Sequence, residues 1–480
     1  MLAEGEIILL MIEKLVYGGQ GLGHHGEQAV FVPRAAPGDE LRVRIVRSKR
    51  GYAVGEIADI VRPSSLRVSP PCPYYERCGG CQLQHLSYAD QLRAKVHQVR
   101  ETLVRIGGFP DPPVRDILSG VEPFGYRNKA IYHARASGEG RLLLGLVGVR
   151  QDEVVDLDHC PLQPDSSNRI LARVRTALER AIREGAVDPA LFRHVMIRTS
   201  EATGQAMVVV VMRQRGFPGK DRLIEELKRE EPSIDSCWLN FNPRLDHSTL
   251  GPEYERIWGP ARLRERLGEM EFEISPEAFF QVNIRQTERL LETVNGYAAL
   301  TGREIVLDLY SGTGLIAISL APRCLLAYGI EISRSATLDA IRNAQINGLN
   351  NCRFRTGKVE RLMRKLLARD FRADASGFPD GMGQGSEAAQ EEIRAAELPA
   401  GAPVVAVLDP PRGGCPPQVL EGLAKMRVKR VIYVSCNPPT LARDLKLLKK
   451  RGYNLIAVQP LDMFPQTYHI ECVALLARTW

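Results

Sequence analysis

The stretch that decides the fold is residues 305–314, Ile-Val-Leu-Asp-Leu-Tyr-Ser-Gly-Thr-Gly. It is apolar and β-branched up to Asp308, then turns on two glycines before the apolar segment 315–320, which is the pattern of a buried parallel strand that leads into a helix. Gly312 and Gly314 would let the backbone approach a ligand closely, and the following helix would point its free N–H groups at that ligand. The stretch therefore predicts a nucleotide-binding turn in an α/β fold.

The same turn also satisfies a second, broader pattern. Gly-x-Gly-x-x-Ala spans residues 312–317, and Glu331 follows downstream, where an acid would bind the hydroxyls of a ribose. From this stretch alone, a dinucleotide-dependent oxidoreductase remains an alternative.

Polar residues and one thiol stand at the ends of the strands predicted after this turn. These strands are expected at residues 325–332, 352–355, 404–408, 431–434 and 472–477, with a helix at 334–347. Glu331, Asp409 and Cys436 follow three of the strands, and Glu471 precedes the last one. The carboxyl ends of parallel strands meet at one edge of a sheet, where open α/β sheets bind ligands. We expect one parallel sheet with a ligand site along that edge, and Cys436 as a nucleophile.

The composition predicts a globular protein with more than one core. The chain has 480 residues, of which 44% are apolar and 25% are charged, and its net charge is +7, so two or three domains are expected. This mild basic balance is compatible with a polyanionic partner, although solvated Lys and Arg side chains explain it as well. The apolar run 7–12 is too short to cross a membrane. We expect a cytoplasmic monomer without a membrane partner.

The first 65 residues alternate short apolar runs with glycine-rich turns, which predicts a small β-barrel. Five cations fall within nine residues of this segment with no acid among them: Arg42, Arg44, Arg47, Lys49 and Arg50. On one edge of a barrel they would follow a phosphate backbone. A strand edge protected by its charge is the alternative.

Three of the ten cysteines lie close together in the sequence. Cys72, Cys78 and Cys81 fall within ten residues that also contain two glycines, and Cys160 stands alone further on. In a cytosolic chain, this thiolate pattern favours a soft metal centre over disulfides. Zinc sites usually contain two paired Cys-x-x-Cys knuckles, and only one is present, so an iron–sulfur cluster is favoured over zinc or free thiols. Radical chemistry on S-adenosylmethionine would use Cys-x3-Cys-x2-Cys, and the x5 spacing argues against it.

Residues between the cysteines and the nucleotide turn show a mixed pattern. Helices are predicted from Ser87 to Gly107 and near 167–184 and 220–230, with a strand that begins at Ala206. Residues 373–400 are dominated by Gly, Ala and Glu, which predicts a flexible insertion.

Taken in order, these motifs make the chain similar to the bacterial RNA uracil-5-methyltransferases, and in particular to the iron–sulfur branch that modifies large-subunit ribosomal RNA. The resemblance covers almost the whole chain and rests on the barrel, the four cysteines, Phe280-Gln-Val-Asn283, Asp308 to Gly314, Asp409-Pro-Pro-Arg412, Ser435-Cys-Asn-Pro438 and His469-Ile-Glu471. It implies an α/β protein with three domains: a TRAM-type OB-like RNA-binding barrel at 1–65, a central α+β RNA-binding domain with a 4Fe-4S cluster at 66–270, and a Rossmann-like class I methyltransferase domain at 271–480.

The resemblance also implies roles for individual residues. Cysteines 72, 78, 81 and 160 would be the cluster ligands. The S-adenosylmethionine and target-base site would be lined by Gln281, Tyr310, Glu331 and Asp409, together with Asp308, Gly312 and Gly314. Cys436 would be the nucleophile and Glu471 the proton acceptor. Lys358 stands where many methyltransferases of this fold carry an acid, which leaves the contacts to adenine open.

The chemistry of uracil explains why a thiol and a carboxylate are needed. Carbon 5 is a poor nucleophile, and addition of the Cys436 thiolate to carbon 6 would turn the ring into an enolate that accepts a methyl group at carbon 5. Glu471 would then remove the proton from carbon 5 so that the thiol can leave. A paired base cannot enter such a pocket, so the target would be a single-stranded or flipped uridine.

Three rivals to this interpretation remain. A transfer RNA uridine-5-methyltransferase would use the same residues. An RNA cytosine-5-methyltransferase would carry Pro-Cys after the fourth strand, whereas this chain has Asp409-Pro-Pro-Arg412 there and Cys415 further on. A non-catalytic, redox-sensing RNA-binding protein would have no need of both Cys436 and Glu471.

Overall fold

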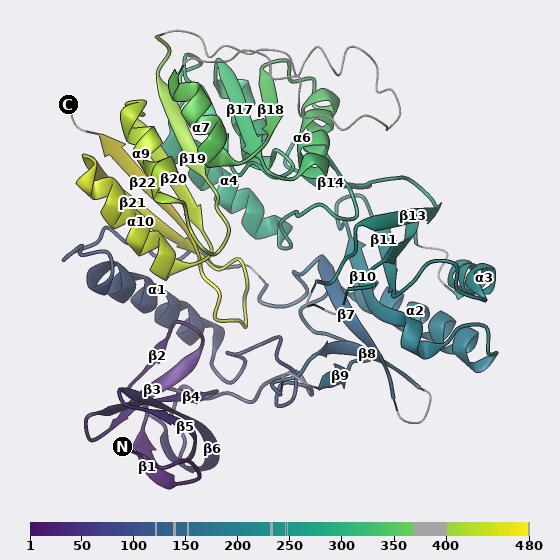
Figure 1. The fold of residues 1–480 in the computed structure, drawn as a ribbon. Helices are drawn as coiled ribbons and strands as arrows, with labels where there is room; N and C mark the ends of the chain where they lie inside the picture. The colour runs from purple at the N-terminus through teal and green to yellow at the C-terminus, as the bar shows by residue number, and fades with distance from the viewer. Residues whose placement is uncertain are drawn as a thin grey trace.

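The structure is a computed structural model, and it describes residues 1–120, 122–137, 141–150, 153–230, 234–244, 246, 248–368 and 401–478. Within these residues, one six-stranded sheet, two seven-stranded sheets and a small two-stranded sheet follow one another along the chain (Figure 1). The predicted insertion at 373–400 lies outside the described residues. No helix in the described part of the chain is both long and apolar enough to cross a membrane.

The N-terminal sheet curls into a barrel-like unit (Figure 1). Its strands are β1 (Ile7–Met11), β2 (Lys14–Val16), β3 (Gln20–His25), β4 (Gln28–Pro33), β5 (Glu40–Lys49) and β6 (Tyr52–Arg62), in the order β1-β5-β6-β4-β3-β2. Along β5 the side chains alternate: Leu41, Val43 and Ile45 are buried, whereas Arg42 and Arg44 are exposed. The barrel therefore presents the predicted cations to solvent.

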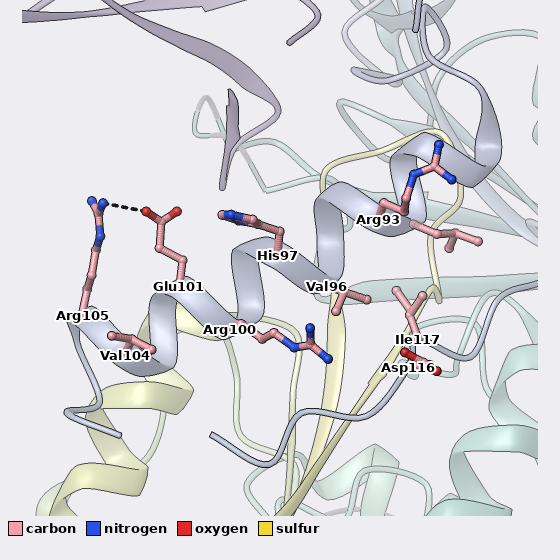
Figure 2. Close-up of a pocket in the computed structure, with 10 residues that line it drawn as sticks. Arg93, Val96, His97, Arg100, Glu101, Val104, Arg105, Asp116 and Ile117 are labelled. Atoms are coloured by element: carbon pink, nitrogen blue, oxygen red, sulfur yellow. Dashed lines mark ion pairs between the residues drawn. The ribbon is translucent and has the colours of Figure 1, made fainter. Parts of the chain in front are cut away.

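A long helix, α1 (Tyr88–Arg105), joins the barrel to the rest of the molecule. As predicted, Ser87 is its N-cap, and the serine side chain accepts a hydrogen bond from the backbone N–H of Asp90. The inward face of α1 contributes Val99 and Leu103 to the core of the C-terminal domain. The outward face lines a groove with the segment around Asp116 and Ile117, as Figure 2 shows.

The central domain is a mixed sheet with two helices packed against it. Its strands, β7 (Lys129–Ala136), β8 (Leu142–Val147), β9 (Val154–Asp156), β10 (Phe192–Thr199), β11 (Ala206–Met212), β12 (Ser236–Phe241) and β13 (Glu253–Trp258), lie in the order β13-β12-β11-β10-β7-β8-β9. Strand β11 is buried along its whole length. Helices α2 (Asp165–Arg183) and α3 (Lys220–Glu230) cover the core of this domain, as the amphipathic patterns predicted.

The C-terminal domain contains the nucleotide turn. Its sheet has the order β18-β17-β16-β19-β20-β22-β21, after the hairpin of β14 (Leu263–Leu267) and β15 (Met270–Ile274). The strands are β16 (Ile305–Leu309), β17 (Leu326–Glu331), β18 (Cys352–Thr356), β19 (Val404–Leu408), β20 (Arg430–Ser435), β21 (Tyr453–Leu461) and β22 (Glu471–Arg478). Helices α7 (Val359–Ala368), α9 (Pro417–Lys425) and α10 (Pro438–Lys450) pack on one face, and α4 (Ile284–Ala298), α5 (Leu315–Leu320) and α6 (Arg334–Ile346) pack on the other (Figure 1).

The expectation of one wholly parallel sheet is wrong. Strands β18, β17, β16, β19 and β20 are parallel, but β22 is antiparallel to both β20 and β21, so the sheet is mixed. An apolar run in a sequence carries no information about strand direction, and this is why the pattern misled. Because β22 runs antiparallel to β20, Ser435, the last residue of β20, lies opposite Cys472 near the start of β22. The residues that flank this pair, Cys436 and Glu471, thus meet at one edge of the sheet.

Candidate active site

A cavity of about 820 Å³ opens at the carboxyl edge of the parallel strands. Loops after β16, β17, β18, β19 and β20 contribute to its wall, together with the segment 277–281 that precedes α4 and the segment that leads into β22. The structure brings nearly all of the predicted site residues to this wall: Gln281, Asp308, Tyr310, Gly312, Glu331, Asp409, Cys436 and Glu471. Of the predicted set, only Gly314 lies outside the lining.

The two glycines of the nucleotide turn serve different needs. Both have left-handed backbones, with φ of 53° at Gly312 and 83° at Gly314. A Cβ on Gly314 would come within 2.9 Å of the Phe354 ring, so this glycine lets the turn pack on the sheet. A Cβ on Gly312 would meet nothing within 4 Å, because this residue borders the open cavity. Gly312 therefore leaves room for a ligand, whereas Gly314 is needed for packing.

Two carboxylates hold the turn in place. Asp308 is fully buried, and its Oδ2 accepts a hydrogen bond of 2.9 Å from the backbone N–H of Ala317 in α5. Glu331 accepts 3.0 Å and 2.7 Å bonds from the backbone N–H groups of Gly312 and Ser333, so it links the first two loops. The Oδ1 atom of Asp308 is buried without a hydrogen-bond partner among the described residues, at the wall of the cavity.

Cys436 lies between β20 and α10, directly before the helix N-terminus. Its loop is held by the hydroxyl of Ser435, which accepts from the backbone N–H of Asn437 at 3.2 Å, and by the amide of Asn437, which donates to the Arg412 carbonyl at 2.9 Å. Burial raises the pKa of the Cys436 thiol to about 11, and the carboxyl groups of Glu471 and Asp409 add to this effect. At neutral pH the thiol of the ligand-free protein is therefore protonated.

The pKa values of the neighbouring acids are raised as well. Burial, reinforced by Asp409, raises the pKa of Glu471 well above its usual range, and Glu471 is only 4% exposed. Burial also raises the pKa of Asp409 to about 7, and that of Asp308 to about 7, with Asp409 and Glu331 as further causes at Asp308. Three acids crowded into one cavity resist ionisation together. The cavity is therefore suited to a cationic ligand, which would favour the ionised carboxylates.

Two basic residues at the rim were not among the predicted site residues. The Arg412 guanidinium lies 3.1 Å from Nε2 and 3.3 Å from Nδ1 of His469, and both side chains line the cavity. Burial and the positive charge of Arg412 lower the pKa of His469 to about 4, so this imidazole is neutral at physiological pH. Arg412 also counteracts the rise in the pKa of Cys436. Both residues belong to motifs quoted above, Asp409 to Arg412 and His469 to Glu471. Their closeness in sequence to Asp409 and Glu471 is the feature from which they could have been predicted as site residues.

Lys358 also lines the cavity, at the turn after β18.

The four predicted cluster cysteines surround a second, smaller cavity. Cys72, Cys78, Cys81 and Cys160 all line it, although Cys160 comes from a segment that is distant in the sequence. Burial raises the pKa of Cys81 to about 12 and that of Cys160 to about 11, and each thiol of the group adds to the shift of Cys81. Within the described residues, no group of three or more His, Cys, Asp or Glu side chains is placed to hold a metal ion. The structure thus gathers the four thiols without showing a metal site.

Known proteins resemble the chain in its parts and as a whole. Residues 2–58 match the TRAM domain, and residues 395–479 match the tRNA (Uracil-5-)-methyltransferase family. An RNA methyltransferase of Halalkalibacterium halodurans is 37% identical over 98% of this chain and 97% of its own length, and one of Caldanaerobacter subterraneus is 36% identical over 99% and 98%. Among solved structures, the Pyrococcus abyssi tRNA (uracil-54, C5)-methyltransferase in complex with S-adenosyl-L-homocysteine has a TM-score of 0.72 and 28% identity, and the match covers 98% of this chain and 99% of that one.

Proposed function

The chain belongs to the S-adenosylmethionine-dependent RNA (uracil-5-)-methyltransferases, and from this premise we propose that it methylates carbon 5 of one uridine in 23S ribosomal RNA through a covalent adduct with Cys436. The main support for the adduct is that Cys436 and Glu471 line the same cavity. A thiol and a buried carboxyl group on one wall match the two roles that the reaction requires.

The proposed chemistry begins with transfer of the Cys436 proton to solvent, which leaves the thiolate. The thiolate adds to carbon 6 of uracil, and the new C–S bond leaves an enolate with electron density at carbon 5. S-Adenosylmethionine, when bound, would supply the methyl group that carbon 5 takes up, with its methyl–sulfur bond broken and S-adenosyl-L-homocysteine left as the second product. Glu471, in its ionised form, then accepts the proton from carbon 5, the electron pair of that C–H bond re-forms the C5–C6 double bond, the C–S bond breaks, and the thiolate of Cys436 is restored.

The cavity offers suitable groups for the methyl donor. In this proposal Glu331, at the end of β17, binds the ribose hydroxyls, and the open side of Gly312 supports it by leaving space for the ligand. The unpartnered Oδ1 atom of Asp308 offers a further acceptor at the wall. Gln281 and Tyr310 add further polar groups to the lining. We assign these residues, with Asp409, to the combined site for the donor and the target base.

We assign a 4Fe-4S cluster to Cys72, Cys78, Cys81 and Cys160. The fit rests on the donor set, because four thiols around one cavity are the ligands such a cluster uses. Iron and acid-labile sulfide measured in protein purified without oxygen test this assignment. Four iron atoms per chain are expected, with loss of iron in Cys81→Ser; zinc, or no metal, would contradict it.

Ribosomal RNA is proposed as the substrate because the four cysteines belong to the resemblance with the iron–sulfur branch. Transfer RNA is the second candidate, since the solved structure that matches almost the whole chain is that of a tRNA (uracil-54, C5)-methyltransferase. In either case the uridine must be unpaired or flipped to reach the buried Glu471. We propose that one chain is sufficient for catalysis, because a single chain supplies both Cys436 and Glu471.

One experiment tests the reaction and the substrate together. Separated rRNA and tRNA from cells that lack the enzyme are incubated with the protein and S-adenosylmethionine labelled at its methyl group, then digested to nucleosides. Label in 5-methyluridine from the ribosomal fraction is the expected result. Label only in tRNA would overturn the substrate, and label in 5-methylcytidine would overturn the reaction.

A further inference from the structure

A residue of the N-terminal barrel contacts the loop that contains Cys436. The hydroxyl of Tyr17, in the turn between β2 and β3, donates a hydrogen bond of 3.3 Å to the backbone carbonyl of Cys436, which is 419 residues away in the sequence. The ring of Tyr17 also meets the ring of Tyr468 edge-on, with 5.6 Å between their centroids. A residue of the N-terminal barrel therefore contacts both segments that carry the proposed catalytic groups.

The neighbouring Gly19 makes this close approach possible. Its φ is +77°, and a Cβ placed on it would lie 3.0 Å from Cβ of Gln82 and 3.1 Å from Cβ of Tyr468. The turn thus sits against the segment that follows the cluster cysteines and against the loop that leads to Glu471. This contact explains why a glycine stands at the tip of the turn.

The bond to the Cys436 carbonyl bears on the reacting sulfur. The carbonyl belongs to the peptide that joins Cys436 to Asn437, and its orientation determines where the Cα–Cβ bond of the cysteine points. The other side-chain hydrogen bonds described for this loop come from Ser435, Asn437 and Thr440, which are part of the same C-terminal domain. Burial raises the pKa of Tyr17 to about 12, so the hydroxyl keeps its proton and remains a donor at working pH.

We propose that Tyr17 is a positioning residue for the nucleophile, so that the barrel is part of the catalytic machinery as well as an RNA-binding module. The proposal rests on the proposed role of Cys436.

The variant Tyr17→Phe removes one hydroxyl and keeps the ring against Tyr468. Tyr52→Phe is the matched control, because Tyr52 lies on β6 of the same barrel, packs on Phe31 and is absent from the cavity lining. We expect kcat to fall about fivefold in Tyr17→Phe, the effect of one hydrogen bond, while KM for RNA stays within about twofold of the parent and Tyr52→Phe matches the parent in both.

A second readout needs no RNA and no methyl donor. Alkylation of Cys436 by iodoacetamide in the free protein is followed by mass spectrometry of its peptide, and we expect the rate to rise about threefold in Tyr17→Phe because the loop is held less firmly. Gly19→Ala, which pushes the turn away from Tyr468, should change the rate in the same direction.

The possible outcomes separate this proposal from the proposed function. An unchanged kcat with a raised KM would make Tyr17 an RNA contact, and an unchanged alkylation rate would remove its effect on the thiol; either result overturns the proposal. If Cys436→Ala retained methyl transfer, the role of Cys436 would fail instead, whatever Tyr17→Phe shows.

Discussion

The Nζ atom of Lys95, on α1, lies 2.6 Å from Oδ1 of Asp462, just after β21, and neither side chain is more than 1% exposed. Lys95 also donates to the carbonyl of Phe464 at 3.3 Å. One turn earlier on the same helix, the amide of Gln91 both donates to and accepts from Gln466. Helix α1 therefore holds residues 462–466 of the segment that leads from β21 to the proposed base, Glu471.

Loss of one partner of this pair should destabilise the protein strongly. Lys95→Met leaves the Asp462 carboxylate buried without its cation, so the free energy of unfolding should fall by about 3–5 kcal/mol in urea titrations. The double variant Lys95→Met/Asp462→Leu should recover most of that loss. Arg93→Met is the control, because Arg93 lies on the outward face of α1 (Figure 2) in an exposed ion pair with Asp90, of a kind worth about 0.2–1 kcal/mol. Additive effects in the double variant would show that the two groups are not coupled.

Replacing Cys436 and Cys415 in turn should show which of the two cysteines is the nucleophile. Cys436→Ala should reduce methyl transfer by at least about 10³-fold, because no other group can activate carbon 6. Cys415→Ala should keep activity close to the parent, since Cys415 is buried in the hydrophobic core beside Tyr433 and Asp444. Transfer of labelled methyl to RNA measures both. Loss of activity in Cys415→Ala alone would favour the cytosine-type arrangement instead.

The variant Glu471→Gln should stop the reaction after methyl transfer. Without a proton acceptor the C–S bond cannot break, so RNA that already carries the new methyl group should stay attached to Cys436. A band that contains both protein and labelled RNA should therefore accumulate on denaturing gels, at close to one RNA per chain. Absence of this band, together with slow formation of free product, would mean that another group removes the proton.

The stability of the protein should depend on pH through Asp308. Its pKa is about 7 in the folded protein against 3.8 for the ordinary side chain, so between these values the folded state binds more protons than the unfolded state. The folded state therefore loses stability as pH rises toward 7, and stability is greatest at low pH as far as this group is concerned. Asp308→Asn removes the group and keeps an acceptor for the Ala317 N–H.

The advantage of Asp308→Asn over the parent should accordingly grow from pH 5 to pH 8, by on the order of 2 kcal/mol. Unfolding of parent and variant in urea at both pH values measures this difference. A difference that is the same at pH 5 and pH 8 would show that Asp308 titrates normally. The variant should also bind S-adenosyl-L-homocysteine more weakly, which calorimetry detects.

Local patterns in the sequence were sufficient for much of the fold. The glycine turn, the strand at 404–408 and the helix that begins after Ser87 are confirmed at their predicted places, and the expected TRAM-type barrel is confirmed by the match over residues 2–58. Strand alternation, N-caps and left-handed glycines act within a few residues, so a single chain segment contains the information that determines them.

The sequence by itself thus determined the elements, the order of the motifs and the identity of the residues at the strand ends. Only the tertiary structure decided that β22 runs antiparallel and brings Glu471 beside Cys436, that Cys160 joins the other three thiols, and that Tyr17 and Lys95 contact the segments next to the proposed catalytic residues. These contacts join residues that are tens to hundreds of positions apart. They depend on how whole sheets and helices pack against one another, which no local pattern of apolar and polar residues specifies.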